Sequence, residues 1–235
     1  MDKEDLKSVI YTFSEVFPYS QVWSSTNFKD LFLIGSLEPI GIEEEKFGER
    51  FSIPGIKEDF KKAAISEPEE ILSHFIFTQE QIKNFEKPKL HLDNYPFLEF
   101  QAPLSLYKGT VSENLEELYS FQEDIEKLFG IKLSPEIKNF QEKNLFAVIA
   151  KEKGDSEEAI KYYEEALKIK THPILEKNLA EFYYGKGNLS EKNEEAIFYY
   201  KKAAELNPKD PVFLNTLGVV YLGENDFENA EIWFK

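Results

Sequence analysis

Cysteine is absent from this sequence of 235 residues, and several other features are scarce. Without cysteine the chain has no disulfide, no thiolate nucleophile and no cysteine-bound zinc. Basic residues are also fewer than acidic ones. The chain has 28 lysine and arginine residues and 44 acidic residues, and its net charge is −16. Nucleic-acid binding depends on a basic surface that displaces counterions, so this balance argues against a nucleic-acid partner.

Long apolar runs are missing as well. No run approaches the roughly 20 residues that a membrane-spanning helix needs. The first residues, MDKEDLKSVIYTF, carry acidic groups and no continuous apolar stretch, unlike a signal peptide. The histidines at 74, 91 and 172 have no ligand-like spacing, so we expect neither a metal nor another cofactor. The sequence therefore predicts a cytoplasmic protein without direct membrane insertion.

What the sequence does contain is an internal repeat from about residue 140 onward. The segment GDSEEAIKYYEEALKI at 154–169 is echoed by NEEAIFYYKKAAELNP at 193–208, and NDFENAEIWFK at 225–235 begins a third copy. Each copy has a small residue followed four positions later by an aromatic one, as in Ala196 and Tyr200, and such a pair shares one helix face. The pattern predicts paired helices that approach closely at the small residues.

The period of this pattern resembles that of the tetratricopeptide repeat. The step from Ala196 to Ala230 is 34 residues, which is the period of that family, although its typical tryptophan is not matched here. We expect about three repeats over 140–235. The third copy stops inside its second helix, so we also expect the chain to be a fragment of a longer protein. The expected turns within the helix pairs are Gly154-Asp155, Gly187-Asn188 and Asn225-Asp226.

The resemblance also implies a binding surface. Tetratricopeptide repeats stack into a solenoid, and the family binds extended peptides or partner helices in a groove lined by the first helix of each repeat. The alternative is that the residues at these positions are ordinary solvated or stacking residues. The positions that we expect to line a groove for a protein or peptide partner are Asn144, Val148, Lys151, Lys177, Glu181, Tyr184, Asn215 and Val219.

The first part of the chain has a different pattern. Apolar residues in 2–18 follow helical spacing and Pro18 ends that helix. The segments 19–25 and 30–36 read as two strands of a hairpin, and DLFLIGS at 30–36 is nearly all apolar, which predicts a strand buried on both faces. Short helices are expected over 41–85. A helix with two strands buries too little apolar surface alone, so further strands are expected beside them.

This order of elements, together with LHLDNYPFLEFQAPLSLY at 90–107, resembles the C-terminal part of spermidine-synthase-like proteins of the type fused to a membrane-embedded segment. The resemblance implies that residues 1–109 are the remnant of a methyltransferase-like α/β sheet and connects the chain with polyamine aminopropyl transfer. The glycine-rich turn that holds the donor nucleotide in such folds is missing. We therefore expect no catalytic residue and no enzyme activity in this chain.

Three polar residues in the same stretch allow two interpretations. Asp93, Asn94 and Glu99 could contribute to a pocket in a full-length protein, because paired carboxylates support acid–base chemistry. Asp93-Asn94 before Tyr95-Pro96 also suits a turn in a structural strap, which we favour.

Taken together, the sequence predicts a mixed, mostly helical fold: a small β-hairpin remnant in 1–109, connecting helices in 110–139 with a single helix over 110–130, and a tetratricopeptide α-solenoid in 140–235. The predicted function is protein–protein interaction, with membrane association through a partner as a further possibility. The alternative is part of an aminopropyltransferase-like or methyltransferase-like enzyme that acts only with a missing N-terminal half.

Overall fold

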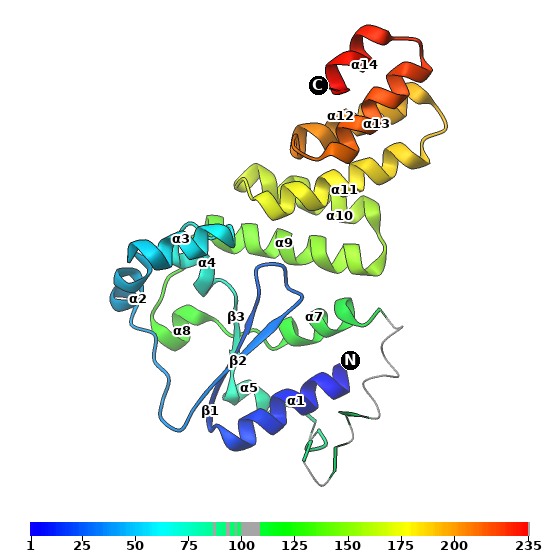
Figure 1. Ribbon diagram of the computed structural model, residues 1–235. Helices are drawn as coiled ribbons and strands as arrows, with labels where there is room; N and C mark the ends of the chain where they lie inside the picture. The colour runs from blue at the N-terminus through cyan, green and yellow to red at the C-terminus, as the bar shows by residue number, and fades with distance from the viewer. Residues whose placement is uncertain (87, 93–94, 97, 100–108, 235) are drawn as a thin grey trace. The chain divides into compact units, whose positions relative to one another are not determined.

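The computed structural model describes residues 1–86, 88–92, 95–96, 98–99 and 109–234. The chain divides into two compact units, Met1–Asp155 and Ser156–Lys235, coloured blue to green and yellow-green to red in Figure 1. We call them the first and the second unit and describe each by itself. The predicted boundary between residues 139 and 140 falls inside the helix Pro135–Lys153, which closes the first unit, and the predicted division into domains stays a prediction.

The first unit combines helices with one small sheet. Its elements are α1 (Lys3–Val16), β1 (Tyr19–Ser24), β2 (Leu31–Ser36), α2 (Glu44–Phe51), α3 (Pro54–Lys62), α4 (Pro68–Leu72), β3 (Phe75–Thr78), α5 (Gln79–Ile82), α7 (Val111–Ser120), α8 (Ile125–Phe129) and α9 (Pro135–Lys153). The predicted helix over 2–18 and the hairpin of 19–25 with 30–36 are confirmed by α1, β1 and β2.

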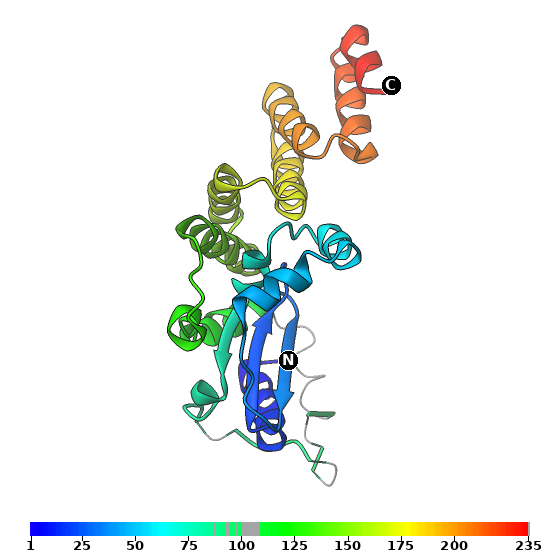
Figure 2. The same ribbon diagram turned by 90° about the vertical axis from the view of Figure 1, so that its left-hand side faces the viewer.

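The sheet is antiparallel and has the order β2-β1-β3; Figure 2 shows the three strands side by side. Val22 of β1 lies opposite Leu33 of β2 and opposite Phe77 of β3. The sequence Phe-Ile-Phe-Thr of β3 falls in a region that we expected to be helical, and that expectation is wrong for these four residues. Four residues are too few to show a periodicity, and their partner strand lies about fifty positions earlier in the chain.

The main core of the first unit lies between α1 and the sheet. Leu6 and Ile10 of α1 pack with Val22 and Phe77, and Leu31 and Leu33 of β2 are partly buried against them. A methyl group on Gly35 would lie 2.5 Å from the ring of Phe17, so glycine is needed for the chain just after α1 to approach β2 this closely.

The prediction that β2 is buried on both faces is wrong. Phe32 and Ile34 are 56% and 45% exposed, whereas Leu31 and Leu33 alternate with them toward the core. β2 is one of the two outer strands of the sheet, and only its face with Leu31 and Leu33 is covered. A continuous apolar run therefore did not indicate burial on two sides here.

The single helix predicted over 110–130 is also wrong, because α7 and α8 are separated by residues 121–124. In this break the Glu123 amide donates to the Ile76 carbonyl over 2.8 Å. The Glu123 carboxylate accepts from the amide and hydroxyl of Thr78, at 2.6 and 2.9 Å. The Asp124 carboxylate then accepts from the Glu126 amide over 3.0 Å and caps α8. Hydrogen bonds between Glu123 and β3 thus form where α7 would otherwise have continued as a helix.

Over residues 156–234, which the structure describes, the regular elements of the second unit are all helices. They are α10 (Ser156–Ile169), α11 (Pro173–Leu189), α12 (Asn193–Leu206), α13 (Pro211–Gly223) and α14 (Phe227–Phe234). The pairs α11–α12 and α13–α14 are the predicted antiparallel hairpins, and Ala196, Ala203 and Ala230 are buried in their contacts. No helix among the described residues is long and apolar enough to cross a membrane.

The three predicted turns have different outcomes. Gly154 and Asn225 follow α9 and α13 with left-handed backbone angles, φ 80° and 60°, as a helix end of this kind requires. Gly187 instead lies inside the last turn of α11, and the turn comes three residues later. Its role is contact, because a methyl group there would lie 2.4 Å from the ring of Tyr200 on α12.

Candidate functional site

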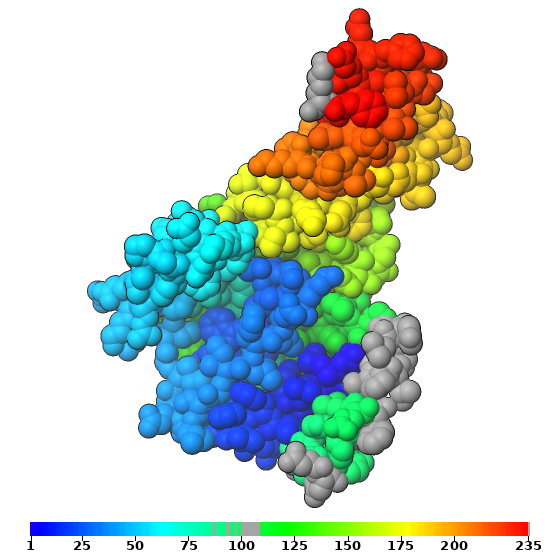
Figure 3. Space-filling view, in the orientation of Figure 1, coloured from blue at the N-terminus to red at the C-terminus, as the bar shows by residue number. Residues whose placement is uncertain are grey.

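The exposed faces of α11 and α13 form the first candidate surface, and both helices contribute to the face of the molecule seen in Figure 3, in yellow and orange. Lys177, Glu181 and Tyr184 share one face of α11 because they are four and three residues apart. Lys177 and Glu181 are exposed and Tyr184 is half-buried. On α13, Asn215 and Val219 are exposed. Five of the eight predicted groove residues therefore lie on these two helices.

Tyr184 connects the two helices within the second unit. Its hydroxyl lies 3.4 Å from the Thr216 hydroxyl of α13. Its ring centroid is 5.2 Å from that of Phe213 on α13 and 5.5 Å from that of Tyr200 on α12. Tyr184 is thus held by packing on both neighbours, and it fixes the exposed faces of α11 and α13 beside each other.

The exposed face of α13 is strongly apolar. Val212, Val219 and Leu222 are 52%, 54% and 43% exposed, and with Asn215 they follow each other at steps of three, four and three residues along one stripe. We call these four residues the α13 stripe. Asn215 and Val219 were predicted to line a groove, whereas Val212 and Leu222 were not, although their helical spacing is visible in the sequence.

The three predicted groove residues of α9 have a different environment. Asn144 and Val148 are 3% and 4% exposed. Val148 packs with Phe28 and Leu115 in a cluster of the first unit, and the Asn144 amide reaches the Thr26 carbonyl at 3.5 Å. Both side chains therefore pack inside the first unit instead of facing an open groove. Lys151 is half-buried.

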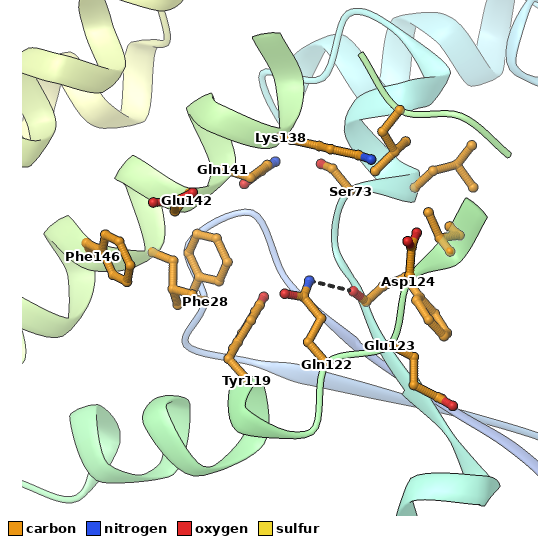
Figure 4. Close-up of a pocket in the computed structure, with 15 residues that line it drawn as sticks. Phe28, Ser73, Tyr119, Gln122, Glu123, Asp124, Lys138, Gln141, Glu142 and Phe146 are labelled. Carbon is orange, nitrogen blue, oxygen red and sulfur yellow. Dashed lines mark hydrogen bonds between the residues drawn. The ribbon is translucent and has the colours of Figure 1, made fainter. Parts of the chain in front are cut away.

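A cavity of about 520 Å³ is the second candidate site, and it lies entirely in the first unit. Figure 4 shows Lys138, Gln141, Glu142 and Phe146 along one side of it, all from α9. The other walls come from the β1–β2 turn, from the end of α7 with the segment that follows it, and from the stretch between α4 and β3. Sequence reasoning missed this site, because its walls come from segments far apart in the chain.

A chain of buried polar groups lies against one wall of the cavity. The Tyr119 and Ser24 hydroxyls are 2.9 Å apart, and the Ser24 hydroxyl is 3.2 Å from His74 Nδ1. His74 Nε2 is in turn 3.1 Å from the side-chain amide nitrogen of Gln141. Burial raises the pKa of Tyr119 well above its usual range, so its hydroxyl is neutral at physiological pH. Ser24 and His74 are buried, and a substrate would not reach this serine without rearrangement of the unit.

A polar cluster joins α10, α11 and α12. The Tyr183 hydroxyl donates to the Glu164 carboxylate and accepts from the Lys202 ammonium, which lies 3.2 Å away. The Lys202 nitrogen also lies 4.5 Å from the centre of the Tyr183 ring. Burial and the bond to Glu164 both raise the pKa of Tyr183. Because these groups satisfy one another across three helices, we assign the cluster to the stability of the repeats.

The residues of the predicted pocket in 90–107 are only partly described. Asp93 and Asn94 lie outside the described residues, and Glu99 is exposed. In the part of the chain that the structure describes, no three histidine, aspartate or glutamate residues are grouped as a metal site would need. The interpretation of Asp93, Asn94 and Glu99 therefore stays a prediction.

Comparison with known proteins identifies the repeats. The tetratricopeptide-repeat pattern matches residues 143–172 and 178–210, and a second pattern described as tetratricopeptide repeat matches 199–232. These matches confirm the predicted repeats, whose helices are α9 to α14.

The chain is also similar to proteins of cyanobacteria. It is 34% identical over 96 residues to the photosystem I assembly protein Ycf3 of Prochlorococcus marinus strain NATL2A, a match that covers 36% of this chain and 53% of that protein. It is 38% identical over 98 residues to the protein of the same name from Synechococcus sp. strain CC9902, with the same coverage. The chain thus spans about half the length of these relatives. Both relatives are named for the assembly of photosystem I.

Proposed function

We propose that this chain is a protein-interaction module and that its repeats bind a segment of a protein partner on the exposed faces of α11 and α13. The observation that carries the proposal is the α13 stripe, in which three large apolar side chains remain exposed on a single helix face. Single exposed apolar residues are common on protein surfaces, but a contiguous row is typical of interaction sites.

The two helices favour an amphipathic partner segment. The α11 face carries one positive and one negative group, Lys177 and Glu181, whereas the α13 stripe is apolar except for the Asn215 amide. A partner helix or extended peptide would place apolar side chains over Val212, Val219 and Leu222 and polar groups toward α11. Tyr184, held between the helices, would provide a rigid aromatic contact in the middle.

A pair of equally exposed positions tests this proposal. Val219 on the α13 stripe and Phe198 on α12 are both 54% exposed. Peptides would be selected by phage display on the purified chain, and their affinities measured by fluorescence anisotropy. Val219→Asp should weaken binding at least about tenfold, because a carboxylate would lose its hydration against apolar groups. Phe198→Asp should leave the affinity unchanged. Equal losses in both variants, or none in either, would contradict the assignment of the surface.

The relatives suggest the kind of process in which the partner takes part. Because the similar proteins are named for assembly of photosystem I, we propose that this chain assists the assembly of a larger protein complex. Association with a membrane protein would then occur through the partner. A photo-crosslinking amino acid at position 219, in cells, should capture a discrete partner that is not captured from position 198. The same set of partners at both positions would argue against this role.

The second candidate function is a contribution to an aminopropyltransferase-like or methyltransferase-like enzyme. Its support is the order α1–β1–β2, which is the order that the resemblance of residues 1–109 to spermidine-synthase-like proteins implies. Calorimetry with S-adenosylmethionine and its decarboxylated form distinguishes the two candidates. We expect no binding, because the chain lacks a glycine-rich nucleotide turn. Saturable binding would favour the enzymatic alternative.

A further inference from the structure

The cavity of the first unit has a chemistry of its own, separate from the surface of the repeats. Its walls include the aromatic side chains of Phe28, Phe75, Tyr119 and Phe146. Phe28 and Tyr119 meet edge to face, with ring centroids 5.9 Å apart and an angle of 64° between the ring planes. Their rings therefore form a corner of the cavity, which Phe146 also lines (Figure 4). The faces of aromatic rings are electron-rich and attract cations.

The charged groups around the cavity have a negative excess. Asp124 and Glu142 are exposed and lie on opposite sides of the cavity (Figure 4). The one lysine of the lining, Lys138, has its ammonium 3.9 Å from the Glu126 carboxylate, which offsets its charge. Glu123 points away from the cavity, where it is bonded to Thr78 (Figure 4).

The excess of negative charge around the cavity favours a positively charged ligand. Two carboxylates remain to attract a positive charge, and the chain as a whole has a net charge of −16. Both features disfavour an anion.

We propose that this cavity binds a small organic ammonium ion with an apolar body. The ammonium group would lie against the corner formed by Phe28 and Tyr119, attracted by the ring faces and by Asp124 and Glu142. The apolar body would pack on Leu72, Ile125 and Leu133, which line the cavity and belong to a different apolar cluster from Phe28. A volume of about 520 Å³ is ordinary for a ligand pocket, whose range is roughly 300–1,000 Å³.

The test uses three probes of nearly the same shape and different charge. Choline is the cation, 3,3-dimethylbutan-1-ol is its uncharged counterpart and 3,3-dimethylbutanoate is an anion of similar size. Binding to the full chain would be followed by NMR, through the ring signals of Tyr119 and Phe146. We expect saturable shifts with choline, binding at least about fivefold weaker for the alcohol and none for the anion.

Variants then separate the aromatic and the ionic contributions. Phe146→Leu keeps apolar bulk and removes a ring, whereas Glu142→Gln removes only charge at an exposed position. Each should weaken choline binding roughly two- to fivefold, while Phe198→Leu, outside the cavity, should change nothing. Circular dichroism would confirm that the variants are folded. If Phe146→Leu does not fold, Glu142→Gln still tests the proposal.

Two results with the wild-type chain would overturn the proposal. One is the absence of saturable choline binding to the wild-type chain. The other is equal binding of choline and the uncharged alcohol, since the cavity would then recognise only an apolar shape. A variant pattern in which Phe198→Leu weakens binding as much as Phe146→Leu would also remove the assignment to this cavity.

Discussion

Gly187 in α11 offers the sharpest test of how the repeat helices pack. A methyl group at this position would lie 2.4, 2.6 and 2.9 Å from three carbon atoms of the Tyr200 ring. Tyr200 is buried, and its hydroxyl donates to the Asn188 side-chain carbonyl over 2.8 Å. The ring is therefore held at both ends and has little room to move aside. We expect Gly187→Ala to destabilise the chain relative to the same change at Gly185.

The comparison with Gly185 removes the effect of helix propensity. Both glycines lie in α11, but a methyl group at Gly185 would have no neighbour within 4 Å. Alanine is favoured over glycine inside a helix by about 1 kcal/mol, so Gly185→Ala should be stabilising by about that amount. Gly187→Ala gains the same term and loses roughly 1–3 kcal/mol to overpacking. The free energies of unfolding of the two variants should therefore differ by about 1–3 kcal/mol.

Urea unfolding followed by circular dichroism would measure this difference. With a slope of roughly 1–3 kcal/mol per molar urea, the two midpoints should be separated by an amount that is easy to resolve, at unchanged slope. Tyr200→Leu provides a further control, because a smaller side chain should reduce the penalty of Gly187→Ala. If Gly187→Ala is as stable as Gly185→Ala, the Tyr200 ring does not limit the space at position 187.

Three further predictions concern other parts of the chain. Leu217→Ala, at a position with no exposed surface, should cost about 2–5 kcal/mol of unfolding free energy, measured in urea. Tyr119→Phe should cost about 1 kcal/mol in the same assay, because the Ser24 hydroxyl loses a partner at 2.9 Å. The Asn229 side chain and backbone lower the pKa of Asp226 by donating to its carboxylate. This contribution to stability is present above the ordinary pKa of about 4 and is lost as the pH falls through the lowered value. The stability difference between the wild type and Asp226→Asn should therefore shrink at acidic pH, and a constant difference from pH 7 to pH 3 would contradict this cause.

The repeats could be predicted from the sequence because their signal is local. Small and aromatic residues four positions apart lie on one helix face whatever surrounds them, so Ala196 with Tyr200 indicated both the helix and its contact side. Local signals also located α1, through the helical spacing of its apolar residues, and the β1–β2 hairpin, through two strand-like segments joined by a short link. Local spacing failed at β3 and at the break between α7 and α8, because both depend on hydrogen bonds between segments more than forty residues apart, such as that from the Thr78 amide to the Glu123 carboxylate.

The candidate sites show more clearly what local spacing can and cannot predict. Helical spacing was enough to place Lys177, Glu181 and Tyr184 on one face of α11. Helical spacing also placed Asn144 and Val148 on one face of α9, but both side chains are buried in the first unit. Spacing tells which residues share a face, but it does not tell what that face meets.

The helix pairs and their period could be read from residue types at short separations, and the composition excluded cysteine chemistry. Contacts between distant segments set which helix faces stay open, leave β2 covered on one side only, and form the cavity between α9 and the end of α7. The physical reason is that burial is a property of the contact and not of the residue: an apolar side chain such as Val148 or Val219 is buried or exposed according to the segments that the rest of the chain brings against it.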